Sequence, residues 1–174
     1  YRGPLFLRGF DDDARNFLAE EIPKKGVDVR FETDVAAIAQ SKDGLRVTFN
    51  DNSTLECDVV MYATGRRPLT DNLGLEACGV ALRDNGAIIV DERYATNIDS
   101  IYAIGDVTDR VNLTPVALAE GMSLAWDLYG KDDKPVDYEF IPSAVFCQPN
   151  LGSVGYTEAE ARDKFGAVTI YKSS

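Results

Sequence analysis

The residues best suited to chemistry are an acid at the end of an apolar segment and a helix start shortly after it. Asp106 follows the run Ile101–Gly105, and Thr114-Pro115 opens a helical pattern. A carboxylate there can accept hydrogen bonds from a polyol such as a flavin's ribitol chain. The free N–H groups of a helix start favour an anion, such as the pyrimidine edge of a reduced flavin. The local alternative is that Asp106 caps a loop and Thr114 caps its helix.

Two arginines near the start of the chain, Arg2 and Arg8, are candidates for binding phosphate. In a dinucleotide-binding βαβ unit, arginine after the second strand accommodates the 2′-phosphate of NADP, whereas an acid there binds the ribose of NAD. Guanidinium suits phosphate because it is always charged and bonds bidentately. Without further context, two surface charges are the simpler interpretation. The sequence contains no Gly-x-Gly-x-x-Gly, so a pyrophosphate loop would have to lie upstream.

A third candidate is the turn Ala63–Pro68, in which Gly65 follows the apolar run Asp58–Thr64. A glycine at the carboxyl end of a buried strand lets a ligand approach the backbone closely. Taken alone this signal is weak, because similar turns commonly connect elements that bind nothing.

Histidine is absent, which excludes histidine-based metal sites, Ser-His triads and imidazole acid–base catalysis. The three cysteines, Cys57, Cys78 and Cys147, are too few and scattered for a disulfide scaffold. Their number indicates a reducing compartment such as the cytoplasm, although an organelle is not excluded. Because they lie in or beside expected strands and helices, we expect them to be small core residues.

Composition narrows the class of protein further. The 174 residues carry 18 basic and 29 acidic side chains, a net charge of −11, so nucleic acid and anionic membrane surfaces are unlikely partners. No apolar run approaches the ~20 residues of a membrane helix. A hydrophobic fraction of 45% and a charged fraction of 27% are typical of a globular protein.

The elements that must position these residues alternate between helix and strand, which predicts an α/β architecture with mixed sheets. Helices are expected at Asp11–Lys25, Thr114–Leu128 and after Thr157, with Thr114 as an N-cap and Pro115 in the first helical position. Asn72–Gly79 is expected to be a short helical or looped piece. An antiparallel meander is expected at Val35–Gln40, Leu45–Phe49 and Thr54–Cys57. Buried strands are expected at Asp58–Thr64 and Ile101–Asp106. Further strands are expected at Val27–Phe31, Ala87–Asp91, Ile141–Cys147, Leu151–Tyr156 and Val168–Lys172, with a polar linker at Lys131–Pro135.

In this order the motifs resemble the flavoprotein disulfide reductase family, and within it the members that reduce glutathione disulfide. The matching segments run along the whole chain: Leu7–Asp11, Arg15–Leu18, Ala63–Pro68, Ala103–Val107, Leu113–Ala117, Ala144–Phe146 and Gly152–Gly155. The resemblance implies parts of two Rossmann-like nucleotide-binding domains and the start of an α+β interface domain. Residues 1–68 would belong to the NADPH domain, 69–138 to the FAD domain, and 139–174 to the interface domain of a homodimer.

The resemblance also implies roles for NADPH-binding residues. Arg2 and Arg8 fall on the family's two 2′-phosphate arginines, and Gly65 on a glycine that contacts NADPH. Ala144 falls where a backbone carbonyl meets the nicotinamide.

For FAD, Asp106 falls on the acid that binds the ribitol, and Thr114 on the threonine whose backbone faces the isoalloxazine. Met122 departs from an arginine that contacts glutathione in some members, which puts substrate contact at this position in doubt.

The family's reacting groups are missing from these residues. No Cys-x-x-x-x-Cys pair occurs, and a catalytic His–Glu pair is impossible without histidine, so we expect no catalytic residue and no metal site here. The chain begins Tyr1-Arg2-Gly3-Pro4, and we expect it to be part of a longer protein rather than a processed domain. Alone it is expected to be inactive.

Alternative interpretations remain open. Dihydrolipoamide dehydrogenase prefers NAD and would be expected to carry an acid at Arg2. Mercuric reductase uses NADPH, so the expected coenzyme does not exclude it. A non-catalytic nucleotide-binding or dimerisation module is the alternative from a different class.

Overall fold

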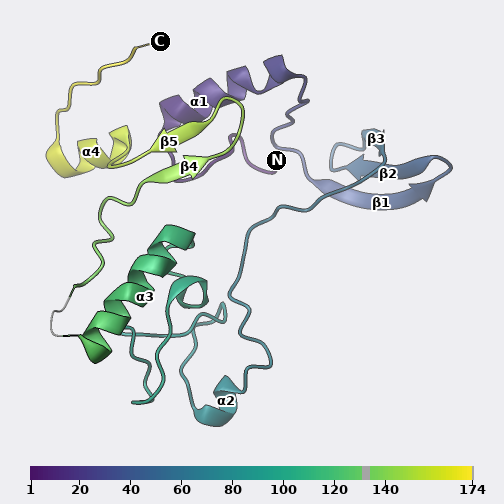
Figure 1. The fold of residues 1–174 in the computed structure, drawn as a ribbon. Coiled ribbons are helices and arrows are strands. Elements are labelled where there is room, and N and C mark those ends of the chain that lie inside the picture. Colours follow the sequence, from purple (N-terminus) through teal and green to yellow (C-terminus); the bar gives the residue numbers. More distant parts are fainter. Residues whose placement is uncertain (131–133, 174) are drawn as a thin grey trace. The chain divides into compact units, whose positions relative to one another are not determined.

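The computed structural model describes residues 1–130 and 134–173 and divides them into two units (Figure 1). The first unit is made of Tyr1–Tyr62 with Glu139–Ser174, and the second of Ala63–Tyr138. Helices and strands are mixed within the chain, which confirms the α/β prediction. Of the predicted linker Lys131–Pro135, the first three residues lie outside the described part.

In the first unit, helix α1 (Asp12–Glu21) begins at a local capping signal. Asp11 is the N-cap, and its carboxylate accepts a hydrogen bond from the Asp13 N–H. Leu18 is the buried residue of the helix. Pro23 starts a separate 3₁₀ turn, η1 (Pro23–Lys25), because proline cannot continue an α-helix. The predicted helix is therefore confirmed, but it ends at Glu21, before Pro23, rather than at Lys25.

Strands β1 (Val35–Ser41), β2 (Gly44–Phe49) and β3 (Thr54–Cys57) form the predicted antiparallel meander. Val47 of β2 pairs with Ile38 of β1 and with Leu55 of β3. Of these three only Val47 is buried, while Ile38 and Leu55 are exposed. Short local connections explain why this sheet could be predicted from the sequence.

The later part of the first unit holds the hairpin of β4 (Ser143–Val145) and β5 (Leu151–Ser153), followed by α4 (Glu158–Phe165). Both strands are shorter than predicted. Helix α4 is confirmed and begins with a capping box, in which Thr157 and Glu160 bond each other's backbone.

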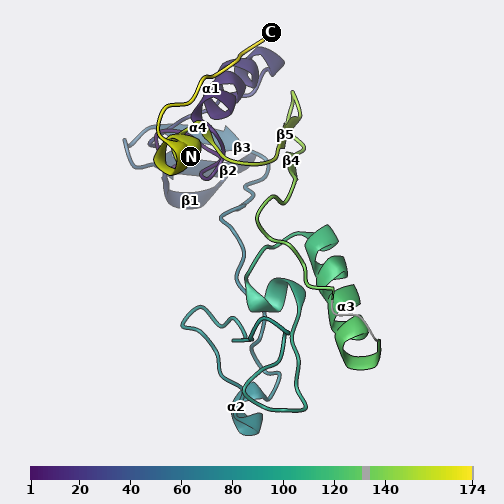
Figure 2. The same ribbon diagram turned by 90° about the vertical axis from the view of Figure 1, so that its left-hand side faces the viewer.

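The second unit contains α2 (Leu75–Cys78), the 3₁₀ turn η2 (Gly105–Thr108) and α3 (Thr114–Tyr129), with η2 packed against α3 (Figure 2). Val80, Ile88 and Ala103 form its buried core. The prediction that Thr114 caps α3 is wrong by one residue. Leu113 occupies the N-cap position, Thr114 is already helical, and the cap makes no side-chain hydrogen bond.

Two strands predicted in the second unit are wrong. Ala87–Asp91 and Ile101–Asp106 each make only an isolated bridge, Leu82↔Ile88 and Ala95↔Tyr102. The second segment turns into η2 at Gly105, where φ reaches +67° and extended pairing ends. A β-ladder needs a neighbouring strand, parallel or antiparallel, paired over several residues, and neither segment has one within the described chain.

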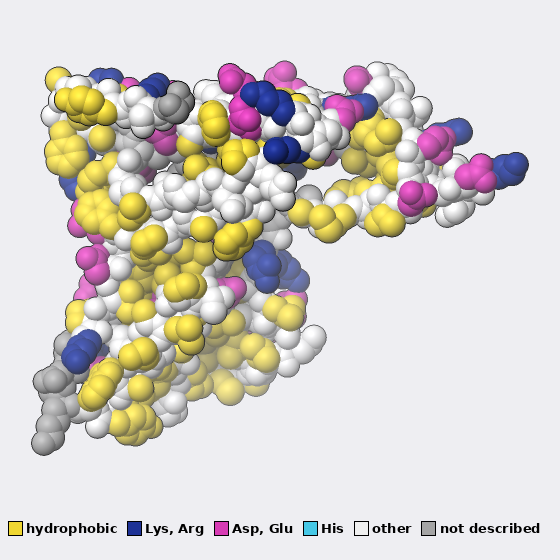
Figure 3. Space-filling model, turned by 45° about the horizontal axis from the view of Figure 1, so that its top comes forward, with side chains coloured by type: hydrophobic (Ala, Val, Ile, Leu, Met, Phe, Trp, Pro, Cys, Tyr) yellow, Lys and Arg dark blue, Asp and Glu magenta, His cyan; other side chains and the backbone are white. Residues whose placement is uncertain are grey.

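In the first unit, and at its boundary with the second, three more predicted strands are wrong: Val27–Phe31, Asp58–Thr64 and Val168–Lys172. Met61 is 83% exposed, so the apolar run that contains it is not a buried strand. Arg30 instead accepts a hydrogen bond at its carbonyl from the Tyr1 amino group. Hydrophobic side chains accordingly lie open on the surface in Figure 3 (yellow). Burial of such runs requires neighbouring strands that the described residues do not provide.

Candidate functional site

Asp106 lies in the first turn of η2, on the surface of the second unit. In the described part of the chain its carboxylate takes part in no hydrogen bond or ion pair. An exposed carboxylate without a protein partner keeps its acceptor sites available for hydroxyl groups of a ligand.

The backbone just before Asp106 is buried against α3, and this requires glycine. Gly105 has φ = +67°, and a Cβ added there would lie 3.1 Å from the Ala117 Cβ. Any side chain would therefore combine a strained backbone with a close contact. The Gly105 carbonyl accepts a hydrogen bond of 2.8 Å from the buried Thr108 hydroxyl. Asp106 therefore follows a backbone segment that is fixed by its packing against α3 and by the Thr108 hydrogen bond.

Behind this turn lies a carboxylate that the sequence analysis missed. Glu120 of α3 is 1% exposed, and its Oε2 accepts a hydrogen bond of 2.6 Å from the Gly105 N–H. Its Oε1 accepts one of 2.7 Å from the Tyr138 hydroxyl. The available signal was helical spacing, since Glu120 shares the buried face of α3 with Val116 and Ser123.

The Tyr138 hydroxyl connects Glu120 to a second tyrosine and a cation. The hydroxyls of Tyr94 and Tyr138 lie 3.2 Å apart, and the Arg110 guanidinium lies 5.3 Å and 5.9 Å from the two ring centroids. Burial raises the pKa of Tyr138, and its hydrogen bonds with Tyr94 and Glu120 raise it further. Tyr138 therefore stays protonated and donates to Glu120.

The start of α3 offers a positive helix end near this turn in the sequence. Thr114 is exposed, and the N-cap residue Leu113 supplies no side-chain acceptor to the first N–H groups. An uncapped helix start stabilises an anion through its N–H groups and dipole. Asp106 and Thr114 thus present a hydroxyl acceptor and an anion-stabilising helix end on one unit, which fits a flavin's ribitol and pyrimidine edge.

The candidate NADPH residues are divided between the units. Arg2, Arg8 and Ala144 lie in the first unit and Gly65 in the second, and all four are exposed. In the described residues neither arginine makes a hydrogen bond or an ion pair, so both guanidinium groups are available to a phosphate. Gly65 has φ = +112° and open space where a Cβ would lie, which suits close approach of a ligand.

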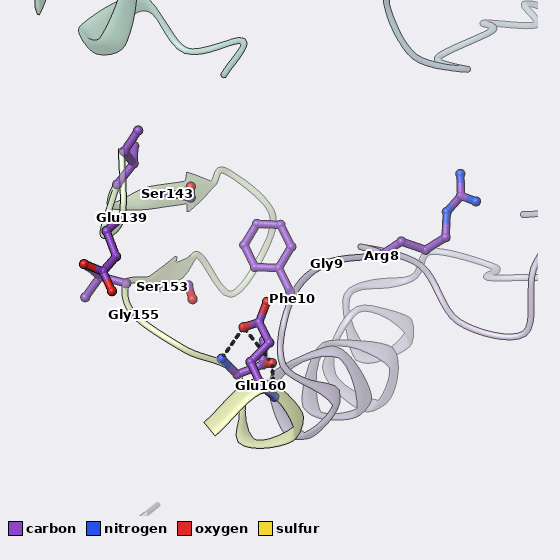
Figure 4. Close-up of a pocket in the computed structure, with 11 residues that line it drawn as sticks. Arg8, Gly9, Phe10, Glu139, Ser143, Ser153, Gly155 and Glu160 are labelled. Atoms are coloured by element: carbon purple, nitrogen blue, oxygen red, sulfur yellow. Dashed lines mark hydrogen bonds between the residues drawn. The ribbon is translucent and has the colours of Figure 1, made fainter. Parts of the chain in front are cut away.

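Arg8 lines a pocket of the first unit together with residues of the hairpin and of the α4 cap (Figure 4). Gly9, Phe10, Ser143, Gly155 and Glu160 are among the other lining residues. The Arg8 side chain points away from the hairpin in this view, whereas Phe10 points toward it. The hairpin edge therefore lies beside the segment that carries one of the candidate phosphate ligands.

No cluster of three or more metal-ligating side chains occurs in the described residues. Cys57, Cys78 and Cys147 are free thiols there. The expectation that they are core residues is wrong, because Cys57 and Cys147 are only half-buried and Cys78 is exposed on the single turn of α2. Among the described residues, no helix is long and apolar enough to cross a bilayer.

Comparison with known proteins assigns the family. Residues 1–121 match the family described as pyridine nucleotide-disulphide oxidoreductase, and residues 141–174 match its dimerisation domain. The chain belongs to the pyridine nucleotide-disulphide oxidoreductase family. The resemblance seen in the sequence motifs is thereby confirmed.

Several characterised relatives align along this chain. It is 47% identical to glutathione reductase of Burkholderia cepacia over 100% of its length and 39% of the relative's. It is 44% identical to trypanothione reductase of Trypanosoma congolense, with 99% of this chain and 35% of the relative covered. The chain therefore spans between a third and two fifths of the length of these relatives.

A solved structure supports the fold. The HOCl-induced flavoprotein disulfide reductase RclA from Escherichia coli superimposes with a TM-score of 0.87 at 32% identity, covering 94% of this chain and 38% of RclA. The local folds seen here are therefore those of a flavoprotein disulfide reductase.

Proposed function

We propose that the full-length protein reduces glutathione disulfide with NADPH, using FAD as the intermediate electron carrier. The observation that carries this proposal is 47% identity to a glutathione reductase over every residue of the chain. A second glutathione reductase, the chloroplastic/mitochondrial enzyme of Pisum sativum, is 44% identical over 97% of the chain.

Asp106 and Thr114 would hold the flavin. The Asp106 carboxylate would accept hydrogen bonds from ribitol hydroxyls, since no protein group occupies it in the described chain. The N–H groups at Thr114 would face the pyrimidine edge and stabilise negative charge there. When bound, FAD supplies the transfer of electrons from NADPH to a disulfide.

Arg2 and Arg8 would bind the 2′-phosphate of NADPH and select it over NADH. Their exposed, unpaired guanidinium groups fit this role, because a dianionic phosphate accepts bidentate hydrogen bonds. Gly65 would let the coenzyme approach the backbone, and the Ala144 carbonyl would contact the nicotinamide.

For domain organisation we propose that residues 1–68 belong to the NADPH domain, 69–138 to the FAD domain and 139–174 to the interface domain. The match of residues 141–174 to a dimerisation domain supports the third assignment and a homodimer. With three free thiols in the described chain, we propose the reducing environment of the cytoplasm.

A second substrate deserves a test because a trypanothione reductase is 44% identical. Met122, which is 64% exposed on α3, replaces the arginine that contacts glutathione in some members, by the resemblance stated above. Loss of that cation would weaken recognition of glutathione's carboxylates.

The test is a kinetic comparison with the purified full-length holoenzyme. NADPH oxidation is followed by absorbance with glutathione disulfide, trypanothione disulfide and lipoamide as separate substrates. We expect the highest kcat/KM with glutathione disulfide. A higher value with trypanothione disulfide would reassign the substrate, and activity with none of them would refute the proposal.

A further inference from the structure

The buried carboxylate of Glu120 is an unusual feature for a helix inside a small protein unit. Among the acidic side chains of the described residues it is the one that is buried, and both of its oxygens accept hydrogen bonds. Burying an ionised carboxylate is costly unless its acceptor sites are filled. Because both oxygens accept hydrogen bonds at full burial, Glu120 holds groups that an apolar side chain could not hold.

Glu120 binds the backbone N–H of Gly105, and Thr108 binds the backbone carbonyl of the same residue. The Gly105 N–H donates to Glu120 Oε2 at 2.6 Å, and the Gly105 carbonyl accepts from the Thr108 hydroxyl at 2.8 Å. Glycine at φ = +67° has no Cβ to restrict it, so these two bonds replace that missing constraint. Together they fix the peptide planes on both sides of the residue that precedes Asp106.

The Glu120 carboxylate is itself held in place by Tyr138, which is paired with Tyr94. Tyr138 donates to Glu120 Oε1, Tyr94 lies within hydrogen-bond distance of Tyr138, and Arg110 lies over both rings. Arg110 also donates to the carbonyls of Val90 and Asp91, which anchors the cation in the loop. The Tyr138 hydroxyl therefore fills one acceptor oxygen of Glu120 and is itself fixed by contacts with Tyr94 and Arg110.

We propose that Glu120 is a positioning residue for the flavin site, acting through the Gly105 N–H to fix the backbone that presents Asp106. Tyr138 has a supporting role, because it fixes the rotamer of Glu120. The proposal rests on the assignment of Asp106 to FAD under the proposed function. It adds a residue that touches no ligand and sets how firmly the flavin is held.

The test measures FAD release from the full-length holoenzyme, followed by the rise in fluorescence of free FAD after dilution. The variants are Glu120→Leu, which removes both acceptors, and Glu120→Gln, which keeps an oxygen for Gly105 and an amide N–H for Tyr138. Asp106→Asn tests the flavin assignment itself. Val80→Ala is the matched control, because Val80 belongs to the core of the same unit but has no bond to Glu120.

We expect Glu120→Leu to release FAD about tenfold faster than the unaltered enzyme, and Glu120→Gln to recover most of the difference. Val80→Ala should lower the melting temperature of the protein while leaving the release rate within about twofold, since a cavity in the core affects stability rather than the Gly105 peptide. Should Glu120→Leu fail to fold, Tyr138→Phe offers a milder perturbation. We expect it to accelerate release to an intermediate extent.

The outcomes separate the two proposals. Faster release from Asp106→Asn together with an unaltered rate in every Glu120 and Tyr138 variant would overturn the role of Glu120 and leave the flavin site intact. Equal acceleration in Glu120→Gln and Glu120→Leu would overturn positioning by the hydrogen bond. Equal acceleration in Val80→Ala would reduce the effect to general instability and overturn it as well. An unchanged rate in Asp106→Asn would refute the flavin assignment.

Discussion

Replacing Asp11 by alanine should loosen two helices at once, because one carboxylate caps both. Asp11 accepts a hydrogen bond of 2.9 Å from the Asp13 N–H at the start of α1. It also accepts one of 2.7 Å from the Glu158 N–H at the start of α4, 147 positions away in the sequence. Both helices belong to the first unit.

The magnitude follows from the two bonds. Loss of an N-cap side chain costs about 1 kcal/mol. A hydrogen bond to a charged acceptor contributes about 1.5–3 kcal/mol, and the lower value applies because Asp11 is only half-buried and water can replace part of it. We therefore expect local opening of α4 to become easier by about 1.5 kcal/mol and opening of α1 by about 1 kcal/mol.

Native-state hydrogen exchange on the full-length protein measures these two openings separately. A change of about 1.5 kcal/mol corresponds to exchange roughly 10-fold faster at the first amides of α4. Thr157→Ala is the matched control, because it removes the capping box of α4 alone and should leave α1 unaffected. Faster exchange in α1 with unchanged exchange in α4 would refute the shared cap.

The same cap predicts a pH dependence. The hydrogen bond from the Glu158 N–H lowers the pKa of Asp11 below its ordinary value of 3.8, against a smaller opposing effect of burial. A carboxyl whose pKa is lowered by folding stabilises the native state fully above its unfolded pKa, and this contribution is lost as the pH falls through the folded value. The difference in protection between Asp11→Ala and the unaltered protein should therefore shrink below about pH 4.

Three further predictions concern the proposed cofactors. The double variant Arg2→Ala, Arg8→Ala should lower kcat/KM for NADPH by at least about tenfold and leave NADH little changed, and an unaltered coenzyme preference would contradict the phosphate assignment. Asp106→Ala should reduce the FAD content of the purified enzyme, measured by flavin absorbance after dialysis, and full occupancy would count against this ligand. The 174 residues expressed alone, supplied with FAD, NADPH and glutathione disulfide, should oxidise no NADPH in a substrate-dependent way, since they contain no redox cysteine pair and no histidine.

Elements whose signals are local could be predicted from the sequence. Asp11 before α1, Thr157 with Glu160 at α4 and the turn after Phe49 each act within a few residues. The predicted helices and the meander are therefore confirmed. Thr114 shows the limit of such signals, because threonine before proline favours an N-cap, yet the helix begins one residue earlier.

Strands predicted from apolar runs depended on neighbours that local sequence does not specify. Val59 and Met61 lie in a run typical of a strand buried on both faces, yet their side chains are 77% and 83% exposed. A pattern of apolar residues indicates that a segment is suited to burial, but pairing partners decide whether it becomes a strand. The same reason explains why Ile101–Asp106 makes a single bridge and then turns.

In the candidate site, the residue proposed to contact the ligand could be predicted from the sequence, whereas the residue that supports its backbone could not. Asp106 could be selected as a candidate from its position after an apolar segment, and the structure places it on the surface. Glu120 could not, because its partners Gly105 and Tyr138 are 15 and 18 positions away and converge only in the folded unit. Helical spacing places Glu120 on a buried face but does not say what it bonds.

The expected effects of replacing Asp106 and Glu120 can be compared from the hydrogen bonds that each side chain would lose. In the proposed FAD site, the exposed Asp106 carboxylate would exchange water for ribitol hydroxyls, and such a charged hydrogen bond contributes about 1.5–3 kcal/mol. Replacing Glu120 by an apolar residue would leave the buried Gly105 N–H without its acceptor, at about 1–3 kcal/mol, whereas the half-buried Tyr138 hydroxyl would keep Tyr94 as a partner. Rotation of the Gly105 peptide could let its N–H find another acceptor and so reduce this cost, but the same rotation would displace Asp106. If Asp106 binds FAD as proposed, FAD retention should therefore be at least as sensitive to replacement of Glu120 as to replacement of Asp106.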